Sequence, residues 1–332
     1  NMKFRNIYLA VALLATSVAF TACSDDDEWN QTGGGKVEMT SPARAFILNE
    51  GTMNHITSNL MYSDWSTGQV NGSDLFRAQS DRVLGDTGND ILTVDNNKLV
   101  VAVNVSNYIA LLDGYGVEKS RVSFEPYKNL GQVRSIDEED GILYVACGNT
   151  LDGVPDNRMF IIDTKNFTDN AVKSIDVCDN TQIVCATDNY VFIQGYGADW
   201  TNTPLWVYDI KSGKPEDTGE YATYVIEGEN DNKAFAVFSK TDWETYETIN
   251  TYFVYDASTK TKTDVTSKIT SAASALANAT IYSLSKGENG SFYITTSLYS
   301  AGNGTVYHFD SNYKLLGSFT SWGQNPKKVV VM

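Results

Sequence analysis

The stretch Tyr252-Phe253-Val254-Tyr255-Asp256 is an apolar, aromatic run that ends in an aspartate, and five other segments repeat this pattern. The others are Leu60-Met61-Tyr62-Ser63-Asp64, Tyr108-Ile109-Ala110-Leu111-Leu112-Asp113, Met159-Phe160-Ile161-Ile162-Asp163, Leu205-Trp206-Val207-Tyr208-Asp209 and Val306-Tyr307-His308-Phe309-Asp310. Successive aspartates are 49, 50, 46, 47 and 54 positions apart. A period of roughly 40–50 residues built from short strands is typical of a β-propeller. The repeat predicts the fold but not the activity, because propellers host many unrelated functions.

Each repeat contains signals for more than one strand. A second apolar run precedes the aspartate-ended run, as in Leu99-Val100-Val101-Ala102-Val103. Five of these preceding runs follow turn pairs such as Asp140-Gly141 and Asn289-Gly290, whose residues tolerate the positive φ of tight hairpins. One more strand lies before the turn pair, and another follows the aspartate. The sequence therefore predicts four strands in each repeat, ordered from the axis of a propeller to its rim.

The two ends of the repeat region predict how the ring closes. The first repeat starts at Ala45 with its second strand and therefore lacks an inner strand, whereas Val329 to Met332 at the other end form a short apolar run. If that run fills the missing position, the ring closes and exposed sheet edges are removed. We expect an all-β fold over residues 40–332, a single β-propeller of six four-stranded blades. Seven blades are the alternative.

The repeated aspartates have a structural interpretation. An aspartate at the end of a strand accepts hydrogen bonds from the amides of the following turn. Because all six copies share this position, we interpret them as turn braces and not as catalytic groups. Helix signals are few, and only Ser271 to Ala279 predicts a short helix.

The N-terminal residues predict a leader that precedes the fold. Lys3 and Arg5 are followed by an apolar stretch at residues 7–18, which is too short to span a bilayer as a helix of about 20 residues. This pattern is typical of a secretory signal peptide. Phe20-Thr21-Ala22-Cys23 then resembles the bacterial lipoprotein box, and the resemblance implies cleavage before Cys23 and lipid attachment to that cysteine. An ordinary signal peptide is the alternative.

The residues after Cys23 predict a tether and a location. Ser24-Asp25-Asp26-Asp27-Glu28 is an acidic run, and residues 30–36 form a Gly-rich spacer. The acidic run resembles the export tag that sends lipoproteins of Gram-negative gut anaerobes to the outer face of the outer membrane. We therefore expect a signal peptide at residues 1–22, a tether at residues 23–39 and exposure at the cell surface, with the periplasmic face as the alternative.

The charge of the chain excludes some partners. Lys and Arg number 25 against 41 Asp and Glu, which gives a net charge of −16, or −18 without Lys3 and Arg5. Nucleic-acid binding depends on basic contacts to phosphate, and anionic membranes attract basic segments. We expect no nucleic-acid partner, and membrane contact only through the lipid anchor.

The cysteines predict neither a disulfide framework nor a metal site. Cys147, Cys178 and Cys185 remain once Cys23 is assigned to lipid, and an odd number cannot all be paired. Cys147 and Cys185 lie in apolar strand runs and are interpreted as small buried residues. Their spacing matches no zinc motif, and the chain has only two histidines. We expect no metal and no cofactor.

The two faces of the predicted propeller carry different loops. Loops that join second to third strands share one face with the connections between blades, and these segments are long, irregular and rich in aromatic residues. Exposed aromatic side chains supply binding area at a low entropy cost. We expect a ligand on this long-loop face, with candidate residues Asn54, His55, Asp86, Tyr127, Arg134, Tyr196, Trp200, Trp243, Tyr299 and Trp322. Shared packing is the alternative for Trp200 and Trp243, which are placed alike in adjacent blades.

Phe46-Ile47-Leu48-Asn49-Glu50-Gly51, with Asn54 after it and Leu84-Gly85-Asp86 further on, resembles a family of surface lipoproteins from Gram-negative gut anaerobes with a YncE-like or YVTN-type propeller. The closing Asn325-Pro326-Lys327-Lys328 also fits the family. One branch, the BtuG type, captures cobalamin at the cell surface and passes it to an outer-membrane transporter. That branch has seven blades, whereas six repeats are visible here.

Three functions follow from these observations. A monomeric surface protein that captures a small nutrient, a corrinoid or a glycan, for a transporter requires a pocket of aromatic and polar residues at the axis of the long-loop face. A protein–protein scaffold requires a broad apolar patch on the same face instead. A propeller lyase or hydrolase requires an acid/base or metal constellation, and no Ser-His-Asp, paired-carboxylate or phosphate-loop pattern stands out, so no catalytic residue is assigned.

Overall fold

The structure, a computed structural model, describes residues 37, 39, 44–64, 69–71, 74–95, 97–148, 157–169, 172–197, 202–298, 304–320 and 327–328. All of them belong to one compact unit, Gly35–Met332. The predicted signal peptide, Cys23 and the tether through residue 36 lie outside the described residues.

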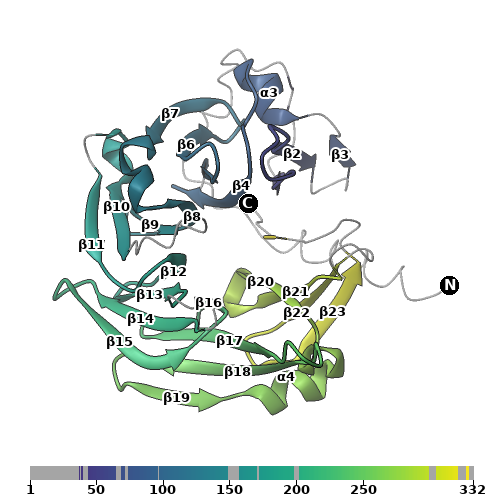
Figure 1. Ribbon diagram of the computed structural model, residues 1–332. Coiled ribbons are helices and arrows are strands. Elements are labelled where there is room, and N and C mark those ends of the chain that lie inside the picture. Colours follow the sequence, from purple (N-terminus) through teal and green to yellow (C-terminus); the bar gives the residue numbers. More distant parts are fainter. Residues whose placement is uncertain are drawn as a thin grey trace, which may run out of the picture. The chain divides into compact units, whose positions relative to one another are not determined.

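Antiparallel sheets follow one another along the chain and form the blades of a β-propeller (Figure 1). Within each blade the strands pair in sequence order, from an inner to an outer strand. Blade 1 contains β1 (Arg44–Asn49), β2 (Asn59–Asp64) and β3 (Gln69–Asn71); blade 2, β4 (Gly88–Val94), β5 (Lys98–Val103), β6 (Tyr108–Asp113) and β7 (Glu118–Ser123); blade 3, β8 (Gln132–Glu139), β9 (Ile142–Gly148), β10 (Arg158–Asp163) and β11 (Lys173–Asp176). Blade 4 contains β12 (Thr181–Ala186), β13 (Tyr190–Gly195), β14 (Pro204–Asp209) and β15 (Lys214–Tyr221); blade 5, β16 (Tyr224–Glu227), β17 (Lys233–Thr241), β18 (Thr248–Asp256) and β19 (Thr261–Asp264); blade 6, β20 (Ile281–Lys286), β21 (Phe292–Thr296), β22 (Thr305–Phe309) and β23 (Leu315–Thr320).

The all-β propeller prediction is confirmed, and the blade count needs one correction. Five blades have four strands, whereas the first sheet has only β1, β2 and β3 among the described residues. The predicted inner strand of that blade, Val329 to Met332, lies outside them. The structure therefore contains five complete four-stranded blades, where the sequence predicted six.

Lys327 and Lys328 lie where the predicted closure requires the chain to pass. The Lys327 ammonium is 5.7 Å from the ring centre of Tyr282, in the inner strand of blade 6. The Lys328 ammonium donates to Asp90 Oδ1 at 2.7 Å, in the inner strand of blade 2. Two successive residues thus contact the blades on either side of blade 1, whose inner position has no other described occupant.

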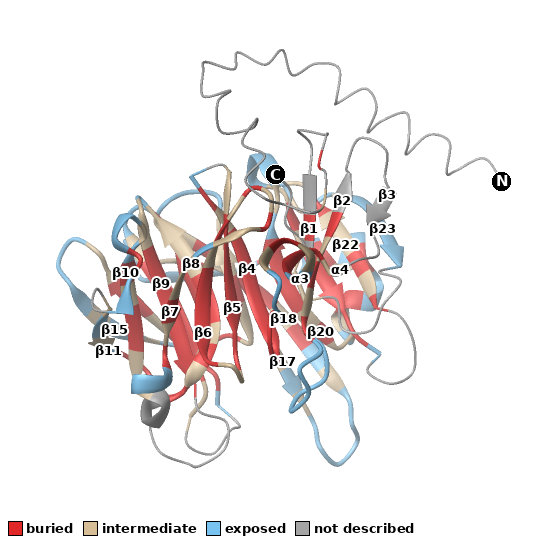
Figure 2. Cartoon of the chain, turned by 90° about the horizontal axis from the view of Figure 1, so that it is seen from above, coloured by how far each residue is buried: buried red, intermediate tan, exposed pale blue. Residues whose placement is uncertain are grey.

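Apolar side chains that alternate along the strands fill the space between neighbouring blades. Figure 2 shows that buried residues line the strands of the blades. In β5, Val100 packs in the cluster between blades 2 and 3, whereas Val101 packs in the cluster between blades 1 and 2. This follows from the period of two in a strand, which sends successive side chains to opposite faces. Similar clusters join blades 3 to 4, 4 to 5 and 5 to 6. A fully buried valine of this kind contributes about 1.5–3 kcal/mol relative to an exposed one.

The repeated aspartates are turn braces, as predicted. Asp113 Oδ1 accepts hydrogen bonds from the amides of Tyr115 and Val117 at 2.9 and 3.0 Å. Asp310 Oδ1 accepts from the amides of Asn312 and Lys314, both at 2.9 Å. The same arrangement recurs at Asp163, Asp209 and Asp256, while the side chain of Asp64 lies outside the described residues.

Helices differ from the prediction in position and number. The expected helix at Ser271 to Ala279 is instead α4 (Thr266–Ala272) followed by the 3₁₀ helix η4 (Ser274–Ala277). A second helix, α3 (Leu75–Ser80), was not predicted; Asp74 caps it by accepting from the amide of Arg77 at 3.2 Å. Its Leu75 and Phe76 are buried in the cluster between blades 1 and 2. Other 3₁₀ helices are η1 (Glu125–Leu130), η2 (Thr164–Asn166) and η5 (Glu288–Gly290).

We expect Asp256→Ala to lower the free energy of unfolding by about 1 kcal/mol, the typical effect of losing a side-chain cap on backbone amides. The Asp256 carboxylate accepts from the Ser258 hydroxyl and from the amides of Ser258 and Thr259, and these hydrogen bonds lower the pKa of Asp256. A carboxyl with a lowered folded-state pKa adds stability above its unfolded pKa, near 4, and loses it as the pH falls. Urea unfolding at pH 7 and pH 3 measures both effects. The same loss of unfolding free energy at both pH values would contradict the role of Asp256 as a turn brace. An equal loss in the control variant Asp231→Ala, in a neighbouring turn, would contradict it too.

Candidate functional site

The inner strands β4, β8, β12, β16 and β20 surround the axis, and each is bonded to a sheet partner on one side only. Backbone amides on the other edge need acceptors of another kind, because an unpaired buried amide is costly. Each inner strand begins at the long-loop face, since it follows a connection between blades. The candidate site is built from the side chains that these inner strands carry.

Side chains of one inner strand supply acceptors for the next. Asp90 Oδ2 accepts from the amide of Ile136 at 3.0 Å, so β4 bonds to β8. Asp137 Oδ2 accepts from the amide of Ala186 at 2.8 Å, so β8 bonds to β12 in the same way. The Ser135 hydroxyl accepts from the amide of Val184 at 3.4 Å. Polar residues in the inner strands thus replace a missing sheet neighbour.

Four inner strands contain a β-bulge at the same place, one or two residues after the strand begins. The register shifts between Gly88 and Asp90, Val133 and Ser135, Thr181 and Ile183, and Ile281 and Ser283. The skipped residues are Asn89, Arg134, Gln182 and Tyr282, which we call the bulge ring. A bulge bends its strand and re-aims a side chain, and bulges are enriched next to functional sites. The bulge ring therefore places four polar residues around the axis at the long-loop face.

Contacts connect the bulge ring to its surroundings. The Asn89 amide donates to the carbonyl of Arg134 in the next blade. The Tyr282 hydroxyl donates to Glu50 Oε2 at 3.3 Å, just after β1. With Lys327 near the Tyr282 ring, this end of the axis combines two cationic side chains, one carboxylate and several neutral donors and acceptors. Such a set can hydrogen-bond a small polar ligand.

Deeper along the axis lies a group of charged side chains that we call the axial charge cluster: Asp90, Asp137, Glu227, Lys286 and Lys328. Lys328 pairs with Asp90, and Lys286 pairs with Glu227. Burial raises the pKa of Asp137 to about 6, although the Lys328 cation and the amides of Ala186 and Glu138 oppose the change. Part of Asp137 keeps accessible surface, but protein groups crowd its carboxylate, so loss of hydration dominates. Burial disfavours the Lys328 cation too, yet Asp90 and Asp137 outweigh that effect and raise the pKa of Lys328.

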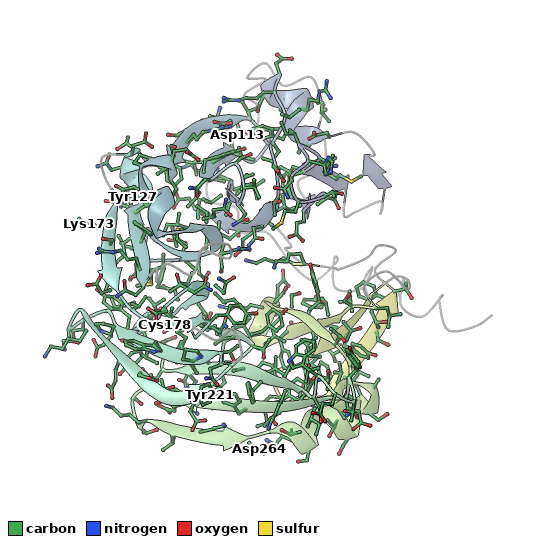
Figure 3. The ribbon with its side chains drawn as sticks, viewed as in Figure 1. Asp113, Tyr127, Lys173, Cys178, Tyr221 and Asp264 are labelled. Carbon is green, nitrogen blue, oxygen red and sulfur yellow. The ribbon has the colours of Figure 1, made fainter. Side chains whose placement is uncertain are left out.

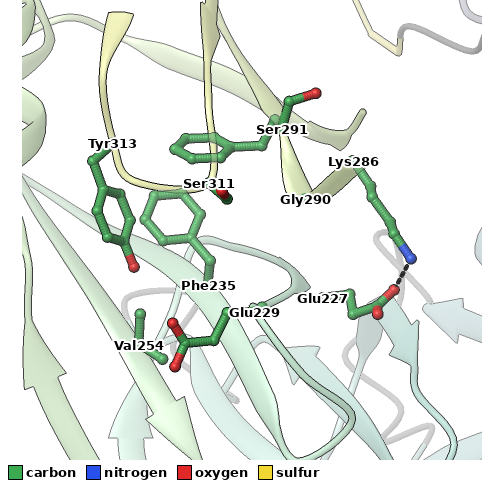
Figure 4. A pocket seen from close by; sticks show the side chains of 11 residues that line it. Glu227, Glu229, Phe235, Val254, Lys286, Gly290, Ser291, Ser311 and Tyr313 are labelled. Atoms are coloured by element: carbon green, nitrogen blue, oxygen red, sulfur yellow. Dashed lines mark hydrogen bonds and ion pairs between the residues drawn. The ribbon is translucent and has the colours of Figure 1, made fainter. Parts of the chain in front are cut away.

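A small pocket lies on the opposite face, between blades 5 and 6 (Figure 4). Its cavity volume is about 40 Å³, room for only a few water molecules. Phe235, Phe292 and Tyr313 line one side, and the Glu227–Lys286 ion pair lines the other. The nutrient hypothesis expected a pocket on the long-loop face, so this pocket does not match it in position or in size.

Acid–base and metal chemistry have limited support among the described residues. Burial, and after it the neighbouring Asp188, raises the pKa of Glu139 to about 7. This carboxyl pair joins the end of β8 to the turn after β12, away from the bulge ring. No group of three or more His, Cys, Asp or Glu side chains that could hold a metal is present in the described part of the chain. Cys147, Cys178 and Cys185 are buried and form no disulfide there.

The predicted ligand residues that the structure describes do not form one cluster. Of the ten, only Arg134 belongs to the bulge ring. Asn54 and His55 are exposed in the β1–β2 loop, and Trp243 is exposed at the β17–β18 hairpin. Tyr196 lies after β13 and is half-buried. Trp200, Tyr299 and Trp322 fall outside the described residues.

Two of the predicted ligand residues instead have structural roles. Tyr127 lies on η1 and packs against Phe124 and Phe160, with ring centres 5.9 and 5.0 Å apart (Figure 3). Asp86 is buried, and its Oδ1 accepts from the hydroxyl of Thr87 at 2.8 Å. Tyr127 is half-buried by these contacts, whereas Asp86 is buried.

Residues of the axis were missed by the sequence reasoning. Asn89, Gln182 and Tyr282 each interrupt the start of an otherwise regular inner strand. That interruption was the available signal, but a bulge is a register feature that one strand alone does not reveal.

Most exposed large apolar side chains belong to the long-loop face. They lie in the connections between second and third strands, or beside them: Met53, Ile56, Trp243, Tyr246, Ile249 and Leu298. No helix in the described ranges is long and apolar enough to cross a membrane.

Comparison with solved structures identifies the class as β-propeller. The chain is similar to hydrazine synthase from Kuenenia stuttgartiensis, with 13% identity, TM-score 0.60, and coverage of 82% of this chain and 88% of the other. A protein of unknown function from Bacteroides caccae has 9% identity, TM-score 0.53 and coverage of 88% and 99%. A quinoprotein alcohol dehydrogenase-like protein from Bacteroides thetaiotaomicron has 11% identity, TM-score 0.51 and coverage of 87% and 78%.

These similarities show the fold alone, because the identities are low and the named functions differ. No protein-family model matches the chain. No curated protein matches it either.

We expect Asp137→Asn to change how stability depends on pH. A group whose folded pKa is raised, here to about 6 from about 3.9 when unfolded, favours the folded state below the unfolded pKa, and this contribution is lost as the pH rises through 6. Asparagine keeps an acceptor for the Ala186 amide but does not ionise, so the variant should lack this loss. Urea unfolding of both proteins from pH 4 to pH 8 measures the difference.

The companion variant Lys328→Met should move the pH at which the loss occurs upward, because it removes the cation that holds the pKa of Asp137 down. It should also destabilise the protein at neutral pH by about 2 kcal/mol, since Asp90 then loses a charge-assisted hydrogen bond. Parallel curves for the wild type and Asp137→Asn would show that Asp137 does not titrate in this range.

Proposed function

We propose that the protein is a ligand-binding β-propeller that captures a small nutrient at the axis of its long-loop face and presents it to a partner transporter. The observation that carries the proposal is the bulge ring. Four strands of separate blades deviate from regular pairing at the same position, although the fold does not require it, since no bulge occurs in the β16–β17 pairing. A shared deviation that gathers polar side chains at one end of the axis is suited to binding.

The ligand is defined by the chemistry of that region. Arg134 and Lys327 favour carboxylate, phosphate or amide oxygens, while Asn89 and Gln182 both donate and accept hydrogen bonds. The ring of Tyr282 offers an apolar surface. A corrinoid carries amide and phosphate oxygens, and a glycan carries hydroxyl groups, so both are suitable candidates. No step of catalysis is proposed, because no acid/base pair adjoins this site among the described residues.

A protein–protein scaffold is the second candidate function. The observation that favours it is the set of exposed apolar side chains on the long-loop face, which a macromolecular partner would cover. A propeller lyase or hydrolase ranks third, and only the Glu139–Asp188 carboxyl pair, at a distance from the bulge ring, would serve it.

The capture proposal is tested by ligand screening of the full-length chain in detergent. Thermal unfolding is measured with cobalamin, related corrinoids and a panel of oligosaccharides, because a ligand at 100 times its Kd adds about 2.7 kcal/mol to stability. For a ligand that binds, we expect Arg134→Ala to weaken the Kd about tenfold or more through loss of a charge-assisted hydrogen bond. Arg134→Lys, which keeps the charge, should recover part of the affinity.

Arg77→Ala on α3 is the matched control, because Arg77 is an exposed arginine on a helix outside the inner strands. Equal effects of the Arg77 and Arg134 substitutions would place binding elsewhere. An absence of any shift with all corrinoids and oligosaccharides would refute nutrient capture and favour the scaffold.

The proposed location is the outer membrane, with the lipid on Cys23 as anchor and the propeller facing the cell exterior. We expect Cys23→Ser to move the protein from the detergent phase to the aqueous phase in phase partitioning, because the anchor would be lost. Protease added to intact cells should digest the wild-type protein at the surface. Retention of Cys23→Ser in the detergent phase would contradict lipid anchoring, and full protection from protease would favour the periplasmic face.

A further inference from the structure

The hairpin of β17 and β18 extends beyond the rest of its blade. These two strands pair from Lys233–Asp256 to Thr241–Thr248. Their neighbours are shorter: β16 pairs only as far as Val237, and β19 pairs only from Phe253 to Asp256. The residues beyond these limits form a two-stranded ribbon on the long-loop face, and Figure 2 shows exposed residues at that end of β17 and β18.

A two-stranded ribbon is at best marginally stable by itself, so its support matters. Here the segment around η4 braces it from one side. The side-chain amide of Asn250 donates to the backbone carbonyls of Leu276 and Ala279 at 2.9 and 2.8 Å. The side-chain amide of Asn278 donates to the backbone carbonyl of Thr248 at 2.8 Å. The helical insertion before β20 therefore holds the ribbon in a fixed position.

The tip of the ribbon, Asp242–Glu247, is itself ordered by hydrogen bonds. The Asp242 amide donates to the carbonyl of Glu247 at 2.9 Å, and the Tyr246 amide donates to the carbonyl of Asp242 at 2.7 Å. Asp242 Oδ1 accepts from the amides of Glu244 and Thr245 at 2.8 and 3.2 Å. Tyr246 adopts φ = 58°, a left-handed conformation that is uncommon for a bulky residue. Strain of this kind persists where the surroundings enforce it, and it is enriched at functional sites.

This rigid tip presents apolar side chains to solvent. Trp243 is 75% exposed and Tyr246 is 77% exposed, the two highest values among the large apolar residues that the structure describes. Ile249, close to them in the hairpin, is 62% exposed. Packing in the apolar core therefore does not explain why these three positions carry apolar side chains. Trp and Tyr are the residues that most often dominate binding energy at protein interfaces, and pre-ordering such anchors lowers the entropy cost of association.

The charges around the anchors indicate the character of the partner. Asp242, Glu244 and Glu247 are exposed on the tip, and among residues 238–252 of the described hairpin Lys240 is the only cation. Carboxylates of this kind attract a positive surface and are repelled by anionic lipid. We infer that the β17–β18 tip is a docking element that inserts Trp243 and Tyr246 into an apolar groove of a protein partner, a groove rimmed by Lys and Arg residues.

The docking element is separate from the bulge ring, which lies on the inner strands at the axis. The inference therefore does not rest on nutrient binding, and either proposal can fail without the other. Together they would give one protein a ligand site and a fixed point of attachment on the same face.

Photo-crosslinking in the native cell tests the docking element. A photoreactive benzoylphenylalanine replaces Trp243 in the full chain, and the control chain carries it at Leu316, which is 53% exposed on β23. We expect position 243 alone to crosslink to a defined protein through a peptide that contains basic residues. With that protein purified, Trp243→Ala or Tyr246→Ala should weaken the Kd about 30-fold, as for interface anchors. Leu316→Ala should leave it unchanged.

The charge of the tip has a separate readout. The double variant Glu244→Gln with Glu247→Gln should slow association at low salt and reduce the salt dependence of the rate, while dissociation changes less. Thermal unfolding of each variant should match the wild type, because the substituted side chains are exposed.

Three outcomes would overturn the inference. One is the absence of any protein crosslinked from position 243, and another is the same crosslinked proteins from positions 243 and 316. The third is tight binding of the wild type, but not of Trp243→Ala, to vesicles of phosphatidylcholine and phosphatidylglycerol, which would make the tip a membrane-contacting element.

Discussion

The inner edge of each blade is the constraint on which the rest of the structure depends. A propeller blade pairs its strands outward from the axis, so the inner strand has backbone amides with no sheet neighbour. Buried amides need acceptors, and here the side chains of the preceding inner strand supply them: Asp90 for Ile136, and Asp137 for Ala186. This requirement brings carboxylates to the axis of a protein whose blades pack through apolar clusters. Those carboxylates in turn require cations. The Lys328 ammonium, near the end of the chain, donates a hydrogen bond to Asp90.

The last described residues and the axial charge are therefore linked. Lys328 lies beside the inner strand of blade 2, and its ammonium lowers the cost of the Asp90 carboxylate in that strand. Removing one partner of such a pair leaves a charge with poor hydration, which costs more than the pair gained. The bulge positions at the long-loop face accept more kinds of side chain, because a bulge leaves one residue of the strand out of the regular pairing. Asn89, Arg134, Gln182 and Tyr282 differ in chemistry although their backbone positions are alike.

The sequence predicted the repeated features well and the irregular ones poorly. Aspartates such as Asp113 and Asp310 recur because each turn needs the same brace, so periodicity and role could both be read from the chain. The bulge ring could not be predicted in this way. Strand register depends on the partner strand, and the sequence of one strand does not show which residue the pairing skips. Tyr127 was predicted on the binding face because its loop is aromatic, but η1 turns its ring into the space beside Phe124 and Phe160. The short helix was misplaced by a few residues, since Thr266 to Ala272 folds where the space between blades 5 and 6 accepts Ile269.

The same distinction separates what supports the fold from what serves a partner. Between the blades, alternation fixes the chemistry of each position, and a change in Val100 or Val101 would be felt by two neighbouring blades. At the β17–β18 tip no blade imposes such a requirement, yet the backbone is held by Asp242 and supported from Asn278. Order without burial has an energetic cost, because the entropy lost by fixing a segment is not returned by apolar area removed from water. Here the hydrogen bonds of Asp242 and Asn278 offset that cost in the free protein, and a partner that covered Trp243 and Tyr246 would add the apolar burial that the tip lacks.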